Sequence, residues 1–81
     1  MFIVYCIYNS QNDKFYIGQT GNLQRRLKEH NSPNGHHTGR FRGEWVLIYK
    51  ESLATRSEAL KREKQLKSAK GREYIKQYIP G

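Results

Sequence analysis

Glu63 is a carboxylate at a position where helical periodicity predicts an apolar side chain. It follows Ala59 by four residues and Leu60 by three, and it precedes Leu66 by three, so it lies with them on the apolar stripe of a predicted helix. A carboxylate that enters a core is costly unless it is paired or binds a cation. Arg62 and Lys64 point away around the helix, so neither is an obvious partner. Two interpretations stay open: a structural ion pair with a residue from elsewhere, and a metal-binding carboxylate.

Arg26 and His30 border the apolar stripe of an earlier predicted helix. Leu23 and Leu27 form that stripe. Arg26 lies three residues after Leu23, and His30 lies four residues after Arg26. An arginine in this position can lay its aliphatic stem over the core and keep its guanidinium in water. The alternative is that the guanidinium neutralises a phosphate.

Tyr5 and Tyr16 belong to two predicted strands that form a hairpin. Their phenols project from one face of the sheet if the paired residue numbers sum to an odd value. Tyr5 then lies opposite Gly18, and Tyr16 lies opposite Ile7. Tyrosines in strands are ordinarily core or edge residues, so this pair alone does not identify a site.

Taken together, these groups are the parts of a site that cleaves phosphodiester bonds. An arginine neutralises the phosphate, and a carboxylate holds a divalent metal ion as Lewis acid. A phenol or an imidazole transfers the proton. The candidate catalytic residues are Tyr5, Tyr16, Arg26, His30 and Glu63.

The elements that must position these residues follow from apolar patterning and turn signals. Apolar runs rich in β-branched and aromatic residues predict strands, and Thr55-Arg-Ser-Glu58 has the pattern of a helix capping box. The expected strands are 2–8, 15–18 and 45–49, and the expected helices are 22–31, 55–69 and 72–79. The order β-β-α-β-α with a helical tail predicts a small α/β (α+β) fold, in which helices flank one three-stranded antiparallel sheet.

Length and composition bound the kind of protein. Eighty-one residues correspond to one domain, expected over 1–81 with a core at about 2–79. The 12% aromatic content argues against a disordered chain. No apolar run has the length of a membrane span, and the first residues lack the pattern of a signal peptide. The single cysteine, Cys6, lies in an apolar run and favours a reducing compartment, so we expect a cytoplasmic protein. A monomer is the default expectation, and pairing through an exposed edge strand is the alternative.

The charge predicts a polyanionic partner. Fifteen Lys and Arg against seven Asp and Glu give a net charge of +8. Nucleic acid is the usual partner of such a chain, through phosphate neutralisation and release of counterions. A merely soluble basic surface is the alternative. An anionic membrane is less favoured, because no predicted helix pairs a broad apolar face with a basic one.

The ordered set of these residues resembles the GIY-YIG nuclease domain. Tyr16-Ile17-Gly18 stands as the second half of that motif, whereas Ile3-Val4-Tyr5 keeps only the tyrosine of the first half. Arg26 matches the helical arginine of the family, and Glu63 matches its metal-binding glutamate. The similarity covers essentially the whole chain. It is greatest to small free-standing bacterial members, which are similar to the nuclease domain of a bacterial excision-repair enzyme.

The resemblance implies that the protein cleaves DNA with one Mg²⁺ or Mn²⁺ and no small-molecule cofactor. Glu63 would bind the metal ion, and Tyr16 would act as general base or orient the attacking water. Tyr5 and Arg26 would hold the scissile phosphate. His30 occupies a helix position where family members carry His or Tyr. The residues expected to contact nucleic acid are Arg25, Lys28, Arg40 and Arg42.

Departures from the family pattern favour a second hypothesis. Larger relatives carry an Asn near the end of the domain, and residues 64–81 contain none. The alternative is therefore a binding module for nucleic acid that keeps the fold but little or no catalysis. A basic scaffold protein is a third hypothesis, but it leaves Glu63 unexplained. His36 and His37 are loop residues that either belong to the surface or lie near the site.

Overall fold

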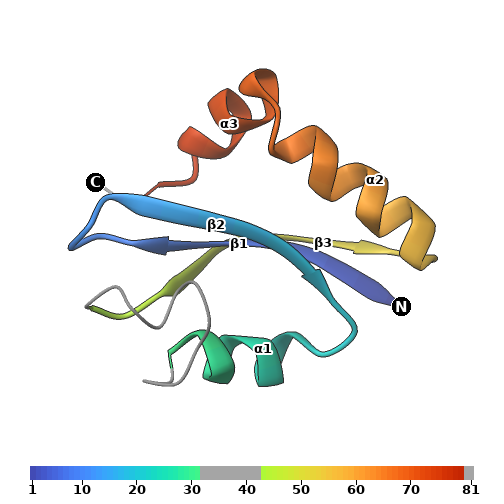
Figure 1. Cartoon of the computed structure of the whole chain (residues 1–81), viewed down its shortest axis with the longest axis horizontal. Helices are drawn as coiled ribbons and strands as arrows, with labels where there is room; N and C mark the ends of the chain where they lie inside the picture. The colour runs from blue at the N-terminus through green and yellow to red at the C-terminus, as the bar shows by residue number, and fades with distance from the viewer. Residues whose placement is uncertain (32–42, 80–81) are drawn as a thin grey trace.

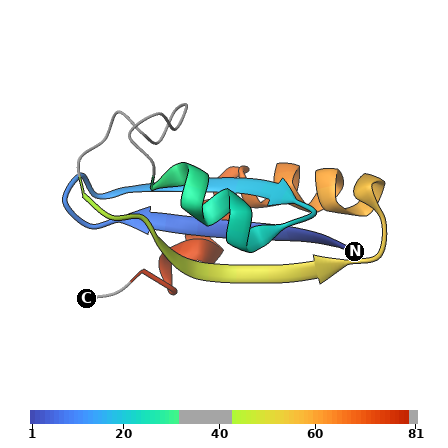
Figure 2. The ribbon, with the colours of Figure 1, turned by 90° about the horizontal axis from the view of Figure 1, so that it is seen from below.

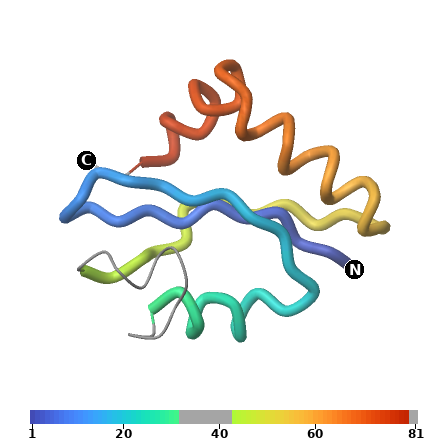
Figure 3. Tube along the Cα trace, viewed as in Figure 1, coloured from blue at the N-terminus to red at the C-terminus, as the bar shows by residue number. Residues whose placement is uncertain are grey.

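The sheet contains three antiparallel strands in the order β2-β1-β3. A computed structural model describes residues 1–31 and 43–79, and Figures 1 and 3 trace their path. The strands are β1 (Phe2–Asn9), β2 (Lys14–Thr20) and β3 (Val46–Leu53). The helices are α1 (Leu23–His30), α2 (Arg56–Leu66) and α3 (Ala69–Lys76). The predicted fold class and element order are confirmed.

The alternation of side chains along β1 creates two cores. Val4 and Cys6 point to the face covered by α2 and α3, where they pack with Leu66 and its neighbours. Tyr5 and Ile7 point to the opposite face, which α1 covers. Figure 2 shows α1 in front of the sheet, with α2 and α3 behind it. We call these two surfaces of the sheet the α1 face and the α2–α3 face.

The register of the hairpin formed by β1 and β2 places both tyrosines on the same face of the sheet. Tyr5 pairs with Gly18, and Ile7 pairs with Tyr16. Because side chains alternate along a strand, both phenols belong to the α1 face. Cys6 points the other way and is fully buried, and burial raises the pKa of its thiol to about 12.

Helix caps decide where the helices begin and correct one prediction. The Thr55 hydroxyl accepts a hydrogen bond from the Glu58 backbone N–H, as the predicted capping box requires. The helix expected over 55–69 instead ends at Leu66, because Ser68 caps a new helix by accepting from the Gly71 backbone N–H. Helix α3 therefore begins at Ala69 rather than 72.

Two further expectations were wrong in detail. Strand β3 continues to Leu53 instead of ending at 49, because its polar residues alternate with residues that pack under α2. Leu60, placed on the apolar stripe of α2, is 47% exposed, so that stripe is narrower than the sequence indicated. Within residues 1–31 and 43–79, no helix has both the length and the hydropathy of a membrane span.

Candidate active site

Three aromatic side chains meet on the α1 face. The Tyr5 hydroxyl and His30 Nε2 are hydrogen-bonded at 2.7 Å. The Tyr16 ring centroid lies 4.9 Å from that of His30 and 6.4 Å from that of Tyr5. Tyr5 and His30 are buried, whereas Tyr16 is half-buried. Tyr16 is therefore the most exposed of the three residues.

Gly18 makes the position of Tyr5 sterically feasible. A Cβ atom at Gly18 would lie 2.8 Å from the Tyr5 hydroxyl and 3.0 Å from a Tyr16 ring carbon. Real Cβ atoms do not approach that closely, so any larger residue would displace the phenols. The glycine of the Tyr-Ile-Gly sequence thus lets the Tyr5 ring pass over β2.

Arg26 joins this cluster through a hydrogen bond to Tyr5. Burial raises the pKa of Tyr5 to about 12, although the Arg26 hydrogen bond acts in the opposite direction. Tyr5 is therefore protonated at neutral pH. Because a guanidinium only donates, the Tyr5 oxygen accepts from Arg26, and its own proton is available to His30.

His30 is held in its neutral form. Burial lowers the pKa of its imidazole, and the positive charge of Arg26 lowers it further. A neutral imidazole can accept the Tyr5 proton at Nε2. Arg26, Tyr5 and His30 thus form one connected polar group. The complete burial of Tyr5 does not agree with the expectation that it contacts a phosphate directly.

Asparagine side chains fix both ends of α1 and so position Arg26 and His30. Asn22 caps the first turn by accepting from the Arg25 backbone N–H at 3.1 Å. Asn31 receives a hydrogen bond from the Trp45 N–H at 2.8 Å and donates to the Trp45 carbonyl at 3.1 Å. Sequence reasoning missed this second clamp. Asn31 at the end of the predicted helix 22–31, where Asn is a known stop signal, was the available sequence signal.

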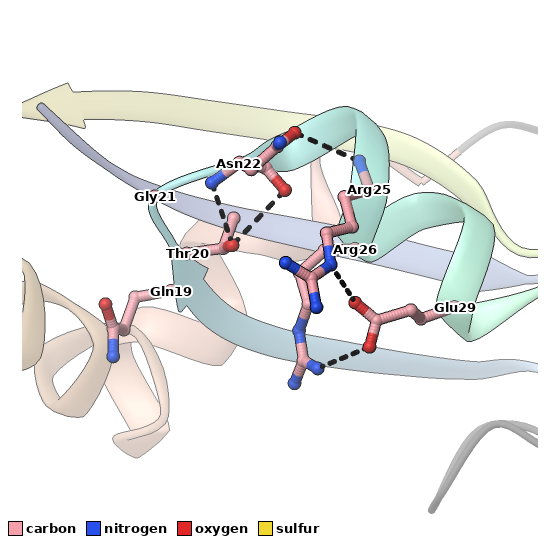
Figure 4. A pocket seen from close by; sticks show the side chains of 7 residues that line it. All are labelled: Gln19, Thr20, Gly21, Asn22, Arg25, Arg26 and Glu29. Carbon is pink, nitrogen blue, oxygen red and sulfur yellow. Dashed lines mark hydrogen bonds and ion pairs between the residues drawn. The ribbon is translucent and has the colours of Figure 1, made fainter.

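A pocket of about 450 Å³ opens between the end of β2 and α1. Figure 4 shows its lining, in which two adjacent arginines and one glutamate are the charged groups. Arg26 connects this pocket to the aromatic cluster. The lining residues are Gln19, Thr20, Gly21, Asn22, Arg25, Arg26 and Glu29.

Glu63 comes from the other helical layer. It lies on α2, is 21% exposed and forms an ion pair of 3.1 Å with Lys67. Its negative charge is the smallest of the causes that act on the pKa of Tyr5. Lys67, one helical turn after Glu63, is the local partner that the sequence pattern did not reveal. Among the described residues, no three His, Cys, Asp or Glu side chains form a metal-binding cluster.

The residues expected to contact nucleic acid, together with the two loop histidines, divide into two sets. Arg25 and Lys28 are exposed on α1, and Arg25 lines the pocket. Four other predicted residues lie outside the described residues: His36, His37, Arg40 and Arg42.

Comparisons with known proteins agree with the resemblance. A UPF0213 protein of Staphylococcus haemolyticus is 33% identical over 76 residues, which are 94% of this chain and 88% of that protein. A UPF0213 protein of Desulfotalea psychrophila is 39% identical over 80 residues, which are 94% of this chain and 69% of that protein.

A solved structure and a family match extend this similarity to the fold. The solution NMR structure of a UPF0213 protein from Bacillus halodurans is similar with a TM-score of 0.57 and 27% identity, covering 100% of this chain and 88% of that chain. The GIY-YIG catalytic domain family matches residues 1–78, which indicates nuclease chemistry, a nucleic-acid partner and the divalent metal ion that such nucleases generally use. Both halves of the site's hairpin lie within that match, and the chain belongs to the GIY-YIG family.

Proposed function

We propose that this protein is a metal-dependent endonuclease that hydrolyses phosphodiester bonds in DNA. The observation that carries the proposal is the meeting of Tyr5, Tyr16, Arg26 and His30 on the α1 face, beside a pocket lined by two arginines. The net charge of +8 supports a polyanionic substrate, because neutralised phosphates release counterions.

Arg26 is the residue proposed to neutralise the scissile phosphate. Its guanidinium lines the pocket, while the hydrogen bond to Tyr5 restricts its orientation. A donor fixed before the reaction stabilises developing negative charge more effectively than one that must reorganise. Tyr5 and His30 act through this restraint and are positioning residues.

Tyr16 is the residue proposed to act on the attacking water. Tyr16 is half-buried whereas Tyr5 is fully buried, so the Tyr16 phenol would orient the water, or would accept the proton of the water after releasing its own proton to solvent. The water oxygen would bond to phosphorus and one P–O ester bond would break. The leaving oxygen would then take a proton from solvent.

Glu63 is the residue proposed to hold Mg²⁺ or Mn²⁺. Magnesium is commonly bound by one or two carboxylates, with substrate phosphate and water completing the shell, so a single carboxylate fits the donor chemistry. The Lys67 side chain that pairs with Glu63 is 50% exposed, so this ion pair can open without burying a charge. When bound, the metal would supply Lewis-acid activation of the phosphate.

The binding module without catalysis remains the second candidate. It is favoured by the position of Glu63, which belongs to the layer opposite α1 and pairs with Lys67. A protein that used only Arg25, Arg26 and the basic surface would bind DNA without needing that carboxylate.

Nicking of supercoiled plasmid separates the two candidates. We expect relaxation of the plasmid by the wild type with Mg²⁺ or Mn²⁺, none with a chelator, and a loss of at least about 100-fold in Glu63→Gln. Glu73→Gln is the matched control, because it makes the same charge change at an exposed glutamate of α3. DNA binding by the wild type without any metal-dependent nicking would favour the binding module.

A further inference from the structure

Glu29 joins the two arginines of the pocket. Its Oε1 lies 3.5 Å from Arg25 Nε, and its Oε2 lies 3.4 Å from Arg26 Nη1. Figure 4 shows the carboxylate between the two side chains, with one oxygen directed at each. One anionic group thus engages two adjacent guanidinium groups at the wall of the pocket.

Helix stability does not explain this arrangement. Glu29 lies in the last turn of α1, where the helix dipole disfavours a negative charge. Both arginines precede the glutamate, which is the less favourable order for an ion pair along a helix. Exposed pairs of this kind contribute little in any order, and the three side chains are 33–78% exposed.

Two other polar side chains at the mouth of the pocket, those of Thr20 and Asn22, are already engaged. The Thr20 hydroxyl donates to the Asn22 carbonyl and accepts from the Asn22 N–H. The Asn22 side-chain oxygen accepts from the Arg25 N–H as the helix cap. The arginines are therefore the cationic donors that the pocket offers to an anion.

We propose that the Glu29 carboxylate is the resting occupant of a phosphate site formed by Arg25 and Arg26. A carboxylate and a phosphodiester both present two oxygens to a guanidinium, so each can engage the same donors. A phosphodiester of nucleic acid displaces Glu29 and places its phosphate at Arg26. The proposal rests on the nucleic-acid partner of the proposed function, but it does not require cleavage.

The test is binding of a duplex oligonucleotide without metal, in a chelator at fixed salt. Glu29→Gln removes the competing charge, so we expect its dissociation constant to fall about three- to tenfold, as Coulomb's law at ~4 Å in water indicates. Glu73→Gln is the control: it has the same change of net charge and loses an ion pair of 3.4 Å at the same i,i+3 spacing, on α3. Its affinity should change less than about twofold.

Each outcome bears on one proposal. A gain in DNA affinity by Glu29→Gln that is well beyond the gain by Glu73→Gln supports the phosphate site, even if the wild type never nicks DNA. Equal effects in the two variants, or weaker binding by Glu29→Gln, overturn it, even if nicking is observed. Circular dichroism of both variants verifies that α1 is intact, and Glu29→Ala, which also removes the charge, should reproduce the gain.

Discussion

Two groups with the same three residue types, a tyrosine, an arginine and a glutamate, lie on opposite faces of the sheet. The α1-face group consists of Tyr5, Arg26 and Glu29. The second group lies on the α2–α3 face and consists of Tyr49, Glu51 and Arg62; we call it the far-face group. In both groups the tyrosine is hydrogen-bonded to the arginine, and burial raises the tyrosine pKa to about 12.

In the far-face group, the tyrosine and the arginine both donate to one carboxylate oxygen. The Tyr49 hydroxyl donates to Glu51 Oε2 at 2.5 Å, and Arg62 Nε donates to the same oxygen at 3.0 Å. These hydrogen bonds lower the pKa of the Glu51 carboxyl, with Tyr49 the larger cause. Donors and acceptor satisfy one another, so the group joins β3 to α2.

The α1-face group is connected differently. The Tyr5 hydroxyl is hydrogen-bonded to His30 instead of to a carboxylate, and Glu29 meets Arg26 from the pocket side. A ligand can therefore replace Glu29 without breaking the bond between Tyr5 and Arg26. Residue types alone do not distinguish a site from a structural group. The hydrogen-bond partner of the phenol does: an imidazole on the α1 face and a carboxylate on the other face.

The largest expected difference between the two groups concerns their arginines. Arg26→Gln should lower the nicking rate by about 10²–10³-fold, because it removes the donor nearest the phosphate. Arg62→Gln should leave nicking within about twofold and reduce stability by up to about 1 kcal/mol, since the lost ion pair is one-third exposed. Plasmid nicking and urea unfolding measure the two effects. Similar losses of nicking in both variants would contradict the distinction.

Gly18 tests whether the α1 face tolerates any displacement of its phenols. Gly18→Ala should cost about 1–3 kcal/mol and slow nicking, because the new Cβ overlaps the Tyr5 hydroxyl. Gly21→Ala is the control, since no atom lies within 4 Å of a Cβ built there. Thermal unfolding measures the stability of both variants. Equal stability would mean that the Tyr5 ring is not confined over β2.

The lowered pKa of His30 predicts how the stability of the protein depends on pH. Its pKa is below 6.5 in the folded protein, so the unfolded chain binds the proton more readily. The contribution of neutral His30 is present above pH ~6.5 and is lost as the pH falls through the folded pKa. Urea unfolding at pH 7.5 and 5.0 should show this loss in the wild type and a smaller one in His30→Gln. A wild type that gains stability at pH 5.0 would refute the assignment.

Glu63 should have the smallest effect on stability. Its partner Lys67 is half-exposed, so Glu63→Gln leaves no buried charge and should change the unfolding free energy by less than about 0.5 kcal/mol. Millimolar Mn²⁺ should raise the melting temperature of the wild type but not that of the variant, because only a folded metal site is stabilised. Strong destabilisation of Glu63→Gln, with no response of the wild type to metal, would remove Glu63 from the metal site.

Local patterning was sufficient to predict most of the fold. The apolar runs of residues 2–8 and 15–18 predicted a hairpin, and the observed register is the one of the two parities that places both phenols on one face. The Thr55–Glu58 cap predicted the start of α2 within one residue. Such features depend on neighbouring residues, which is why the sequence reveals them.

The features that the sequence did not reveal depend on distant or competing contacts. The Asn31–Trp45 clamp joins residues 14 apart, and the Tyr49–Glu51–Arg62 group spans a strand and a helix. The break at Ser68 is a competition between continuing α2 and capping α3. The layer to which Glu63 belongs follows from the path of the whole chain, and periodicity within α2 does not encode it.

The most direct test of the central claim replaces the accessible phenol of the α1 face and an exposed phenol of α3. Tyr16→Phe and Tyr74→Phe remove one hydroxyl each, and the Tyr74 residue is 41% exposed. With Mn²⁺ and supercoiled plasmid, the nicking rate of Tyr16→Phe should fall by at least about 100-fold, and that of Tyr74→Phe should stay within about twofold of the wild type. Unchanged nicking by Tyr16→Phe would contradict a catalytic site on the α1 face.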